Sequence, residues 1–165
     1  MSKKKNLSDY NIEEVPDASA MKIAIVFAEW NEEVTKALVE GAKGSLIKHG
    51  LKEENLSVIP VPGSYELPMA AQYVLRDNKN IDAVICIGCV IQGETRHFEF
   101  ISQAVSAGIM QVALEYQKPV VFGVLTTDNF QQAKERSGGK HGNKGDEAAV
   151  TAIKMVALNN ANNSR

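Results

Sequence analysis

Four runs of apolar residues, rich in valine and isoleucine, recur along the chain, and a stretch with helical periodicity follows each of them. The runs occupy residues 21–28, 56–61, 83–91 and 120–125. Unbroken apolar runs of this length are typical of strands buried on both faces of a parallel sheet, because half-exposed strands alternate apolar with polar residues. Since parallel strands need helical crossovers, the pattern predicts an α/β fold.

The segments between the runs carry the spacing of amphipathic helices. From Val34 to Leu46, apolar and small residues recur at helical spacing, with Asn31 placed to cap the helix and Gly50 just past its end. Further helices are expected from Pro68 onward and over residues 98–115, 129–136 and 145–158. Right-handed crossovers then give a three-layer α/β/α sandwich around a mostly parallel sheet.

The length of 165 residues fits a single domain. We expect residues 1–20 to form a polar arm, residues 21–159 the domain, and residues 160–165 a short tail. Acidic residues and Pro16 follow the early lysines where a signal peptide would be apolar, and the longest apolar run is too short to cross a membrane. A net charge of −2 argues against binding to nucleic acid. These features predict a soluble, cytoplasmic protein without membrane or nucleic-acid partners.

Polar and aromatic residues follow the carboxyl ends of all four predicted strands, where α/β sheets bind their ligands. They are residues 29–31, 62–66, 92–97 and 126–128. Trp30 and Tyr65 occupy equivalent loop positions, which favours a stacking platform for a flat heterocycle, although either ring alone could serve packing.

Residues 88–95, GCVIQGET, imitate a phosphate-binding loop. A nucleotide-binding loop needs lysine after its second glycine, and Glu94 stands there instead, so ATP or GTP hydrolysis is not expected. A glycine turn before a helix still favours one small phosphate, with Thr95 beside it. No GxGxxG motif indicates a dinucleotide.

The histidines differ in their surroundings. His97 lies at the ligand edge next to Thr95, so we interpret it as a proton shuttle, although an isolated loop histidine is more often structural. His49 is expected at the surface, where it would stabilise the end of a helix. The segment 136–145, RSGGKHGNKG, is either a solvated loop or a clamp for a phosphate monoester, with one or two of Arg136, Lys140 and Lys144 on the ligand.

Cys86 and Cys89 form a CxxC pair, which raises the alternative of redox chemistry. Strand positions three apart point to opposite faces, which favours buried structural cysteines instead. No HExxH motif or second cysteine pair indicates a metal site. We therefore expect no metal site.

Four segments of the sequence resemble the 6,7-dimethyl-8-ribityllumazine synthase family. They are VPGSYELPMAA, AVICIGCVIQGETRHFEFI, PVVFGVLTTDN and QAKERSGGKHGNKGDEAA, and the similarity spans about residues 21–159. The resemblance implies a flavodoxin-like fold and a transferase of riboflavin biosynthesis. Its reaction would join 5-amino-6-(D-ribitylamino)uracil (the uracil amine) to 3,4-dihydroxy-2-butanone 4-phosphate (the butanone phosphate), with release of phosphate and water and without a metal or organic cofactor.

The resemblance also implies roles for individual residues. Those expected at the uracil amine are Trp30, Ser64, Tyr65, Glu66, Cys89, Val90, Ile91 and, from a neighbouring subunit, Phe122. Those expected at the butanone phosphate are Glu94, Thr95 and the cationic clamp Arg136, with His97 as the proton-transfer residue and Lys144 and Glu147 lining the site. Trp30 and Tyr65 stand where most relatives have phenylalanine.

The family resemblance further implies a homopentamer with active sites between subunits, in some relatives assembled into a shell of sixty subunits. The short segment 136–143 is similar to that of shell-forming relatives, and the arm would add a strand to a neighbour's sheet. Two other classes stay open: a flavodoxin-like module that binds a heterocycle without chemistry, and a redox protein that uses Cys86 and Cys89.

Overall fold

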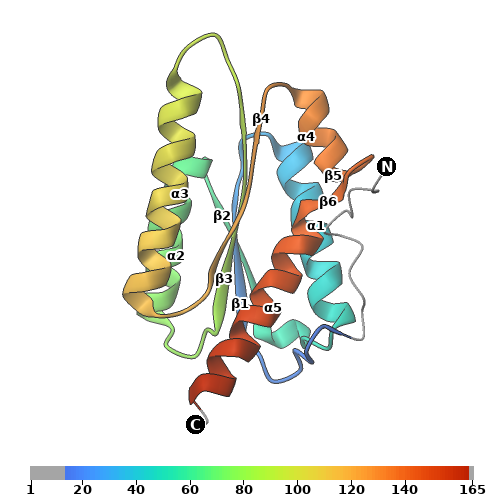
Figure 1. The fold of residues 1–165 in the computed structure, drawn as a ribbon, viewed down its shortest axis with the longest axis vertical. Coiled ribbons are helices and arrows are strands. Elements are labelled where there is room, and N and C mark those ends of the chain that lie inside the picture. Colours follow the sequence, from blue (N-terminus) through green and yellow to red (C-terminus); the bar gives the residue numbers. More distant parts are fainter. Residues whose placement is uncertain (1–13, 164–165) are drawn as a thin grey trace, which may run out of the picture.

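The computed structural model describes residues 14–163 and has a four-stranded parallel sheet at its centre. The strands are β1 (Ile23–Ala28), β2 (Leu56–Val61), β3 (Ala83–Ile91) and β4 (Val120–Thr127), in the order β2-β1-β3-β4. All three neighbouring pairs are parallel. The strands coincide with the four apolar runs, and the predicted parallel sheet is confirmed (Figure 1).

Five α-helices cover the two faces of this sheet. They are α1 (Glu32–Lys48), α2 (Leu67–Asp77), α3 (His97–Tyr116), α4 (Phe130–Arg136) and α5 (Lys144–Asn163). Helices α2 and α3 lie on one face, and α1, α4 and α5 lie on the other, which confirms the three-layer sandwich (Figure 1). Two short 3-10 helices (Glu53–Asn55 and Ser64–Glu66) and a small hairpin of β5 (Ser137–Gly139) and β6 (Gly142–Asn143) complete the described chain.

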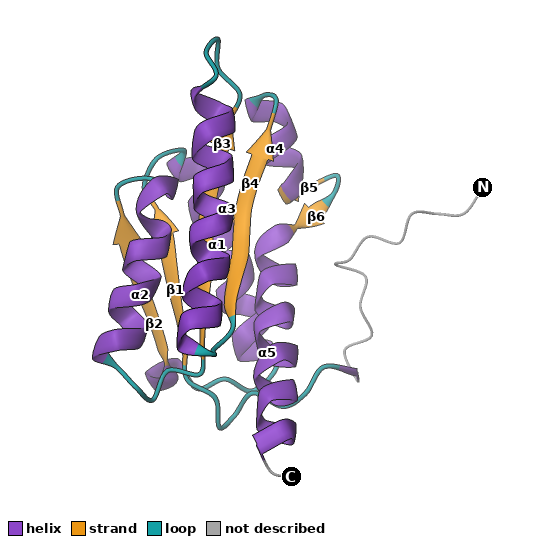
Figure 2. Ribbon diagram, turned by 60° about the vertical axis from the view of Figure 1, so that its left-hand side comes forward, coloured by secondary structure: helices purple, strands orange, loops and turns teal. Residues whose placement is uncertain are grey.

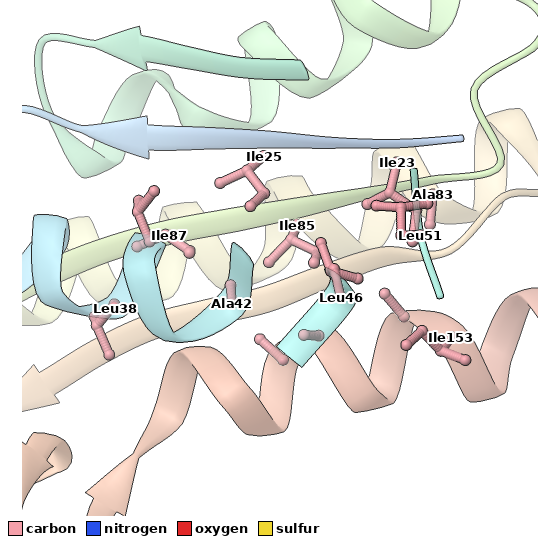
Figure 3. Close-up of a cluster of buried hydrophobic side chains, with 14 of the residues drawn as sticks. Ile23, Ile25, Leu38, Ala42, Leu46, Leu51, Ala83, Ile85, Ile87 and Ile153 are labelled. Atoms are coloured by element: carbon pink, nitrogen blue, oxygen red, sulfur yellow. The ribbon is translucent and has the colours of Figure 1, made fainter. Parts of the chain in front are cut away.

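Each face of the sheet has its own apolar core. Ile25, Ile85 and Ile87 point to the face covered by α1 and α5, where they meet Leu38 and Ile153 (Figure 3). Neighbouring strand residues such as Ala24, Val84 and Cys86 pack under α2 and α3. Burial on both faces explains why the strands have no polar alternation.

The strand register leaves the end of β3 with a neighbouring strand on one side only. The pairing of β1 with β3 ends at Phe27 and Ile87, whereas β3 pairs with β4 as far as Ile91 and Thr127. Residues 88–91 therefore extend beyond β1 at the carboxyl edge of the sheet. Ligands of α/β sheets bind at such a switch point, where the connections from two neighbouring strands diverge.

Two local features differ from the expectations, and a third agrees with them. Asn31 occupies the N-cap of α1 but makes no capping hydrogen bond with its side chain, and its backbone is left-handed (φ 61°). His49 is buried rather than exposed, because the end of α1 packs under the chain around Ala18, whose N–H donates to the His49 carbonyl at 2.9 Å. Gly50, with φ 99°, follows the helix as expected.

The predicted arm and tail lie partly within the described residues. Residues 1–13 and 164–165 lie outside them. Of residues 14–20, Ala18 is fully buried and Val15 packs against the core, so this part of the predicted arm lies on the domain. Helix α5 continues past Leu158 to Asn163. Across the described range, no helix is both long enough and apolar enough to cross a membrane.

Candidate active site

The loops after β1 and β2 are joined to each other. The Glu29 N–H donates to the Val61 carbonyl at 2.8 Å, and the Trp30 N–H donates to the Pro62 carbonyl at 3.2 Å. The indole of Trp30 lies over Gly63, where a Cβ would come within 3.3 Å of the ring. The Trp30 side chain is nevertheless 71% exposed, so most of it is available to a ligand.

The turn after β2 presents one aromatic and one acidic side chain. The carboxylate of Glu66 accepts a hydrogen bond from the Gly63 N–H at 3.0 Å, which holds the turn closed. Tyr65 is 59% exposed at the same edge. Ser64 is buried instead, because its hydroxyl packs onto Gly88 of β3, where a Cβ would come within 2.5 Å of it. Ser64 therefore joins β2 to β3 rather than facing outward.

The end of β3 offers backbone hydrogen-bonding groups. On the side of β4, the Val84 N–H donates to the carbonyl of Pro119, just before β4, at 2.9 Å, and the Gln92 N–H donates to that of Thr127 at 2.8 Å. Because backbone groups alternate along a strand, those of Cys89 and Ile91 face the opposite side, beyond the end of β1. There the Cys89 carbonyl accepts a hydrogen bond from Asn31 Nδ2 at 2.9 Å. A polar ring can form hydrogen bonds with these backbone groups, as a neighbouring strand would.

The segment between β3 and α3 carries Glu94 and Thr95, and α3 begins at His97 (Figure 2). All three are exposed. The His97 N–H donates to Thr95 Oγ1 at 3.4 Å. Arg96 forms an exposed ion pair with Glu99 at 3.2 Å. The N–H groups at a helix N-terminus attract an anion, which suits one phosphate group.

Phe122, Arg136, Lys144 and Glu147 lie together, but in a different place from Trp30. They line a groove of about 960 Å³ over β4, between α3 and α5. Arg136 Nη1 donates to the Gln132 carbonyl at 3.0 Å, and Lys144 Nζ pairs with Glu147 Oε1 at 2.7 Å. Among the described residues, none that line this groove comes from the ends of β1 or β2. The predicted site residues thus form two groups within one chain.

The cysteines occupy opposite faces of the sheet. Cys86 packs under α2 and α3, and Cys89 lies in the core under α1 and α5. Burial raises the pKa of the Cys86 thiol well above its ordinary value and that of Cys89 to about 11. Both thiols are therefore neutral near pH 7 and point apart, which argues against a redox pair. Within residues 14–163, no three His, Cys, Asp or Glu side chains are grouped as metal ligands.

The strand order β2-β1-β3-β4, with helices on both faces and polar and aromatic groups at the junction of β1 and β3, defines a flavodoxin-like α/β protein. The model of the family described as 6,7-dimethyl-8-ribityllumazine synthase matches residues 20–160, and the chain belongs to this family.

Three relatives, each named 6,7-dimethyl-8-ribityllumazine synthase, illustrate the similarity. The protein from Cytophaga hutchinsonii is 60% identical over 153 residues, which cover 93% of this chain and 95% of the relative. The protein from Parabacteroides distasonis is 54% identical, covering 92% and 94%. The protein from Campylobacter jejuni is 51% identical, covering 85% and 90%.

Sequence reasoning missed the role of Asn31 in joining β1 to β3. It treated Asn31 as a helix cap, because asparagine is common at that position. The signal that was available is that asparagine is one of the few residues other than glycine that readily adopt a left-handed backbone. The close packing of Gly63 and Gly88 was also not foreseen, since it depends on contacts between strands.

Proposed function

We propose that the carboxyl edge of β1, β2 and β3 binds the uracil amine, and that the first turn of α3 binds the butanone phosphate. The chain is a 6,7-dimethyl-8-ribityllumazine synthase by family and catalyses the penultimate step of riboflavin biosynthesis. One observation carries the assignment of the site. Trp30, the turn at Glu66 and the unpaired backbone of β3 lie together at one switch point of the sheet.

The proposed site suits each part of the uracil amine. The exposed indole of Trp30 gives a face for stacking, and Tyr65 stands beside it on the next loop. The backbone groups of Cys89 and Ile91, on either side of Val90, face the polar edge of the ring. Glu66, already fixed through Gly63, accepts hydrogen bonds from the ribityl hydroxyls.

The proposed chemistry needs proton transfer more than a strong nucleophile. The uracil amine adds to the ketone, and loss of water gives an imine, for which His97 shuttles protons near neutral pH. Elimination of phosphate is favoured where N–H groups of α3 and Thr95 meet the departing anion. Holding the two substrates together supplies much of the remaining rate enhancement.

We also propose that each active site forms between two subunits, with Phe122 and Arg136 supplied by a neighbour. Both lie in the groove over β4, away from Trp30. The same groove exposes large apolar side chains on α3 and α5: Met110, Leu114, Met155 and Leu158. Exposed apolar surface of this kind marks a protein contact.

A ring of subunits needs two different contact surfaces on each chain. The second candidate surface lies at the other edge of the sheet, over β2 and α2, and its apolar members include Ile59, Met69, Tyr73 and Val74. This arrangement suits the homopentamer expected for the family, which could assemble further into a shell of sixty subunits. Light scattering and electron microscopy of the purified protein distinguish these assemblies.

The reaction is tested by supplying both substrates to the purified protein and following the absorbance of the lumazine. We expect turnover only when both are present, without added metal, and undiminished by a chelator. A protein that binds the uracil amine but forms no product would instead favour the binding module. Product that depends on added thiol reductant would favour a role for Cys86 and Cys89.

A further inference from the structure

Asn31 combines two features that residues of ordinary loops do not share. Its backbone is left-handed, with φ 61°, one of two such non-glycine residues in the described chain. Its side chain spans to another strand, where Nδ2 donates to the Cys89 carbonyl at 2.9 Å. Asparagine adopts a left-handed backbone more readily than other residues with a side chain, and here the hydrogen bond from its amide to β3 holds it in place.

These two features connect the two parts of the proposed site. One is the indole of Trp30, which would stack on the face of a ring, and the other is the backbone of β3, which would bind its polar edge. Trp30 immediately precedes Asn31, so the left-handed backbone of Asn31 sets the direction of α1 relative to the loop that carries the indole. The amide of Asn31 fixes the Cys89 carbonyl on the open side of β3, beyond the last pairing of β1 with Ile87. There β1 itself no longer supplies a partner, and the side chain takes the place of the missing strand.

We propose that Asn31 is a positioning residue for the uracil amine. It holds the stacking face of Trp30 and the hydrogen-bonding edge of Cys89 and Ile91 in a fixed relation before the substrate arrives. This inference rests on the proposed function, because it concerns the ring site at the same edge. Asn31 acts through Trp30 and the β3 backbone.

Two substitutions distinguish the effect of the Asn31 backbone conformation from the effect of its side chain. Asn31→Gly keeps the left-handed conformation at no steric cost but removes the amide. Asn31→Asp keeps the shape and tolerates the conformation, but turns an oxygen toward the Cys89 carbonyl. For Asn31→Gly we expect the KM for the uracil amine to rise about two- to tenfold, as for a lost hydrogen bond. Asn31→Asp should have the larger effect, and the KM for the butanone phosphate should change less than about twofold for both.

The chain offers a second readout that does not need turnover. Trp30 is the only tryptophan in the sequence, so its fluorescence reports on this site alone. Titration with the uracil amine by itself should quench Trp30, with a Kd that weakens in Asn31→Gly by the same factor as the KM. A merely structural role would lower the urea midpoint without this selective change in affinity.

Gln117 provides a matched control. It is the other non-glycine residue with positive φ (51°) among the described residues, and it lies at the end of α3, where it lines the groove over β4 at the opposite end of the sheet from Asn31. Glycine keeps its left-handed backbone. Gln117→Gly should leave the affinity for the uracil amine unchanged. Unaltered Kd and KM in Asn31→Gly, or an equal rise in KM for both substrates, would overturn the inference. Absence of turnover in the unmutated protein would contradict the proposed function instead.

Discussion

Arg136 and Lys140 are two neighbouring cations with different surroundings. Arg136 lines the groove over β4 together with Phe122, whereas Lys140 is exposed on the hairpin. If Arg136 clamps the phosphate, Arg136→Ala removes a charged hydrogen bond and should raise the KM for the butanone phosphate about ten- to a hundredfold. The KM for the uracil amine should change little in steady-state assays.

Lys140→Ala is the control for this prediction, since it removes the same charge without touching the groove. It should leave both KM values close to those of the unmutated protein. Equal weakening of both substrates by Arg136→Ala would show that the guanidinium does not bind the phosphate. Similar effects of Arg136→Ala and Lys140→Ala would indicate only a loss of net positive charge.

His97 is exposed at the first position of α3, where it is free of the core. His97→Ala should lower kcat by about a hundredfold or less, because proximity carries the rest of the catalysis. Quenching of Trp30 by the uracil amine should be almost unchanged, since a proton shuttle acts on the transition state. A His97→Ala enzyme with unaltered kcat would exclude His97 from proton transfer.

The residues at the strand ends could be predicted because each follows an apolar run directly. Trp30, Tyr65 and His97 needed only the rule that parallel strands end at one edge of a sheet. The separation of Arg136 from Trp30 could not be predicted this way, because it depends on how α4 and the hairpin after it turn over β4. The side-chain bond from Asn31 to Cys89 was equally out of reach, since its partners lie far apart in sequence.

Helices α1 and α5 approach each other most closely where α5 begins. A Cβ on Gly145 would overlap the carbonyl oxygen of Leu38 in α1. Gly145→Ala should therefore force the helices apart and lower the free energy of unfolding by about 1–3 kcal/mol, as overpacking does. Urea unfolding followed by circular dichroism measures this change.

Gly44, which is exposed on the outer side of α1, is the matched control because a Cβ there would meet nothing within 4 Å. Gly44→Ala should raise the free energy of unfolding by about 0.5–1 kcal/mol, since alanine favours the helix. If Gly145→Ala proved as stable as Gly44→Ala, the close contact between α1 and α5 would be wrong.

The end of α1 should make stability depend on pH. Burial of His49, followed by the charge of Lys48, lowers the pKa of its imidazole below the ordinary value. The folded chain then binds fewer protons than the unfolded chain just below about pH 6.5. The contribution of neutral His49 to the free energy of unfolding is therefore complete above that pH and is lost as the pH falls below it. Urea midpoints measured from about pH 8 to pH 5 should decline less steeply for His49→Gln. Identical slopes would assign the decline to other groups.

Almost all helix and strand positions could be predicted from the sequence, because apolar periodicity and helix-breaking residues can be recognised from neighbouring residues alone. The hairpin of β5 and β6 was not predicted, since its glycine-rich residues carry no strand pattern and pair over only a few positions. The burial of His49 was missed for a different reason: it depends on the segment around Ala18, which looked polar and separate. Local sequence patterns identify helices and strands, but they do not show which distant segments pack over them.

At the scale of the whole molecule, the proposed interface predicts that activity requires assembly. Phe122 and His97 would belong to different chains at each site, so subunits carrying Phe122→Ala or His97→Ala should be weak when expressed alone. Co-expression should restore part of the activity, because some interfaces in a mixed ring retain both residues. The measurement is kcat per subunit in verified mixed assemblies.

Two comparisons complete this experiment. Co-expression of His97→Ala with chains carrying both substitutions should give no recovery, because no interface then pairs an intact His97 with an intact Phe122. Mixed rings of the two single variants that fail to exceed their parents would locate the whole site within one chain. That result would leave the groove over β4 as a contact surface only.

The packing of α1 against α5 also bears on how the protein is made. Helix α1 leaves the ribosome well before α5, the helix that packs over Leu38 and Ala42. Until α5 is synthesised, this apolar side of α1 is exposed to chaperones and to other nascent chains. The layer of α2 and α3 is complete earlier, because its core reaches no further along the chain than Val124 in β4. A chain cut short before residue 144 would therefore lack the cover for α1.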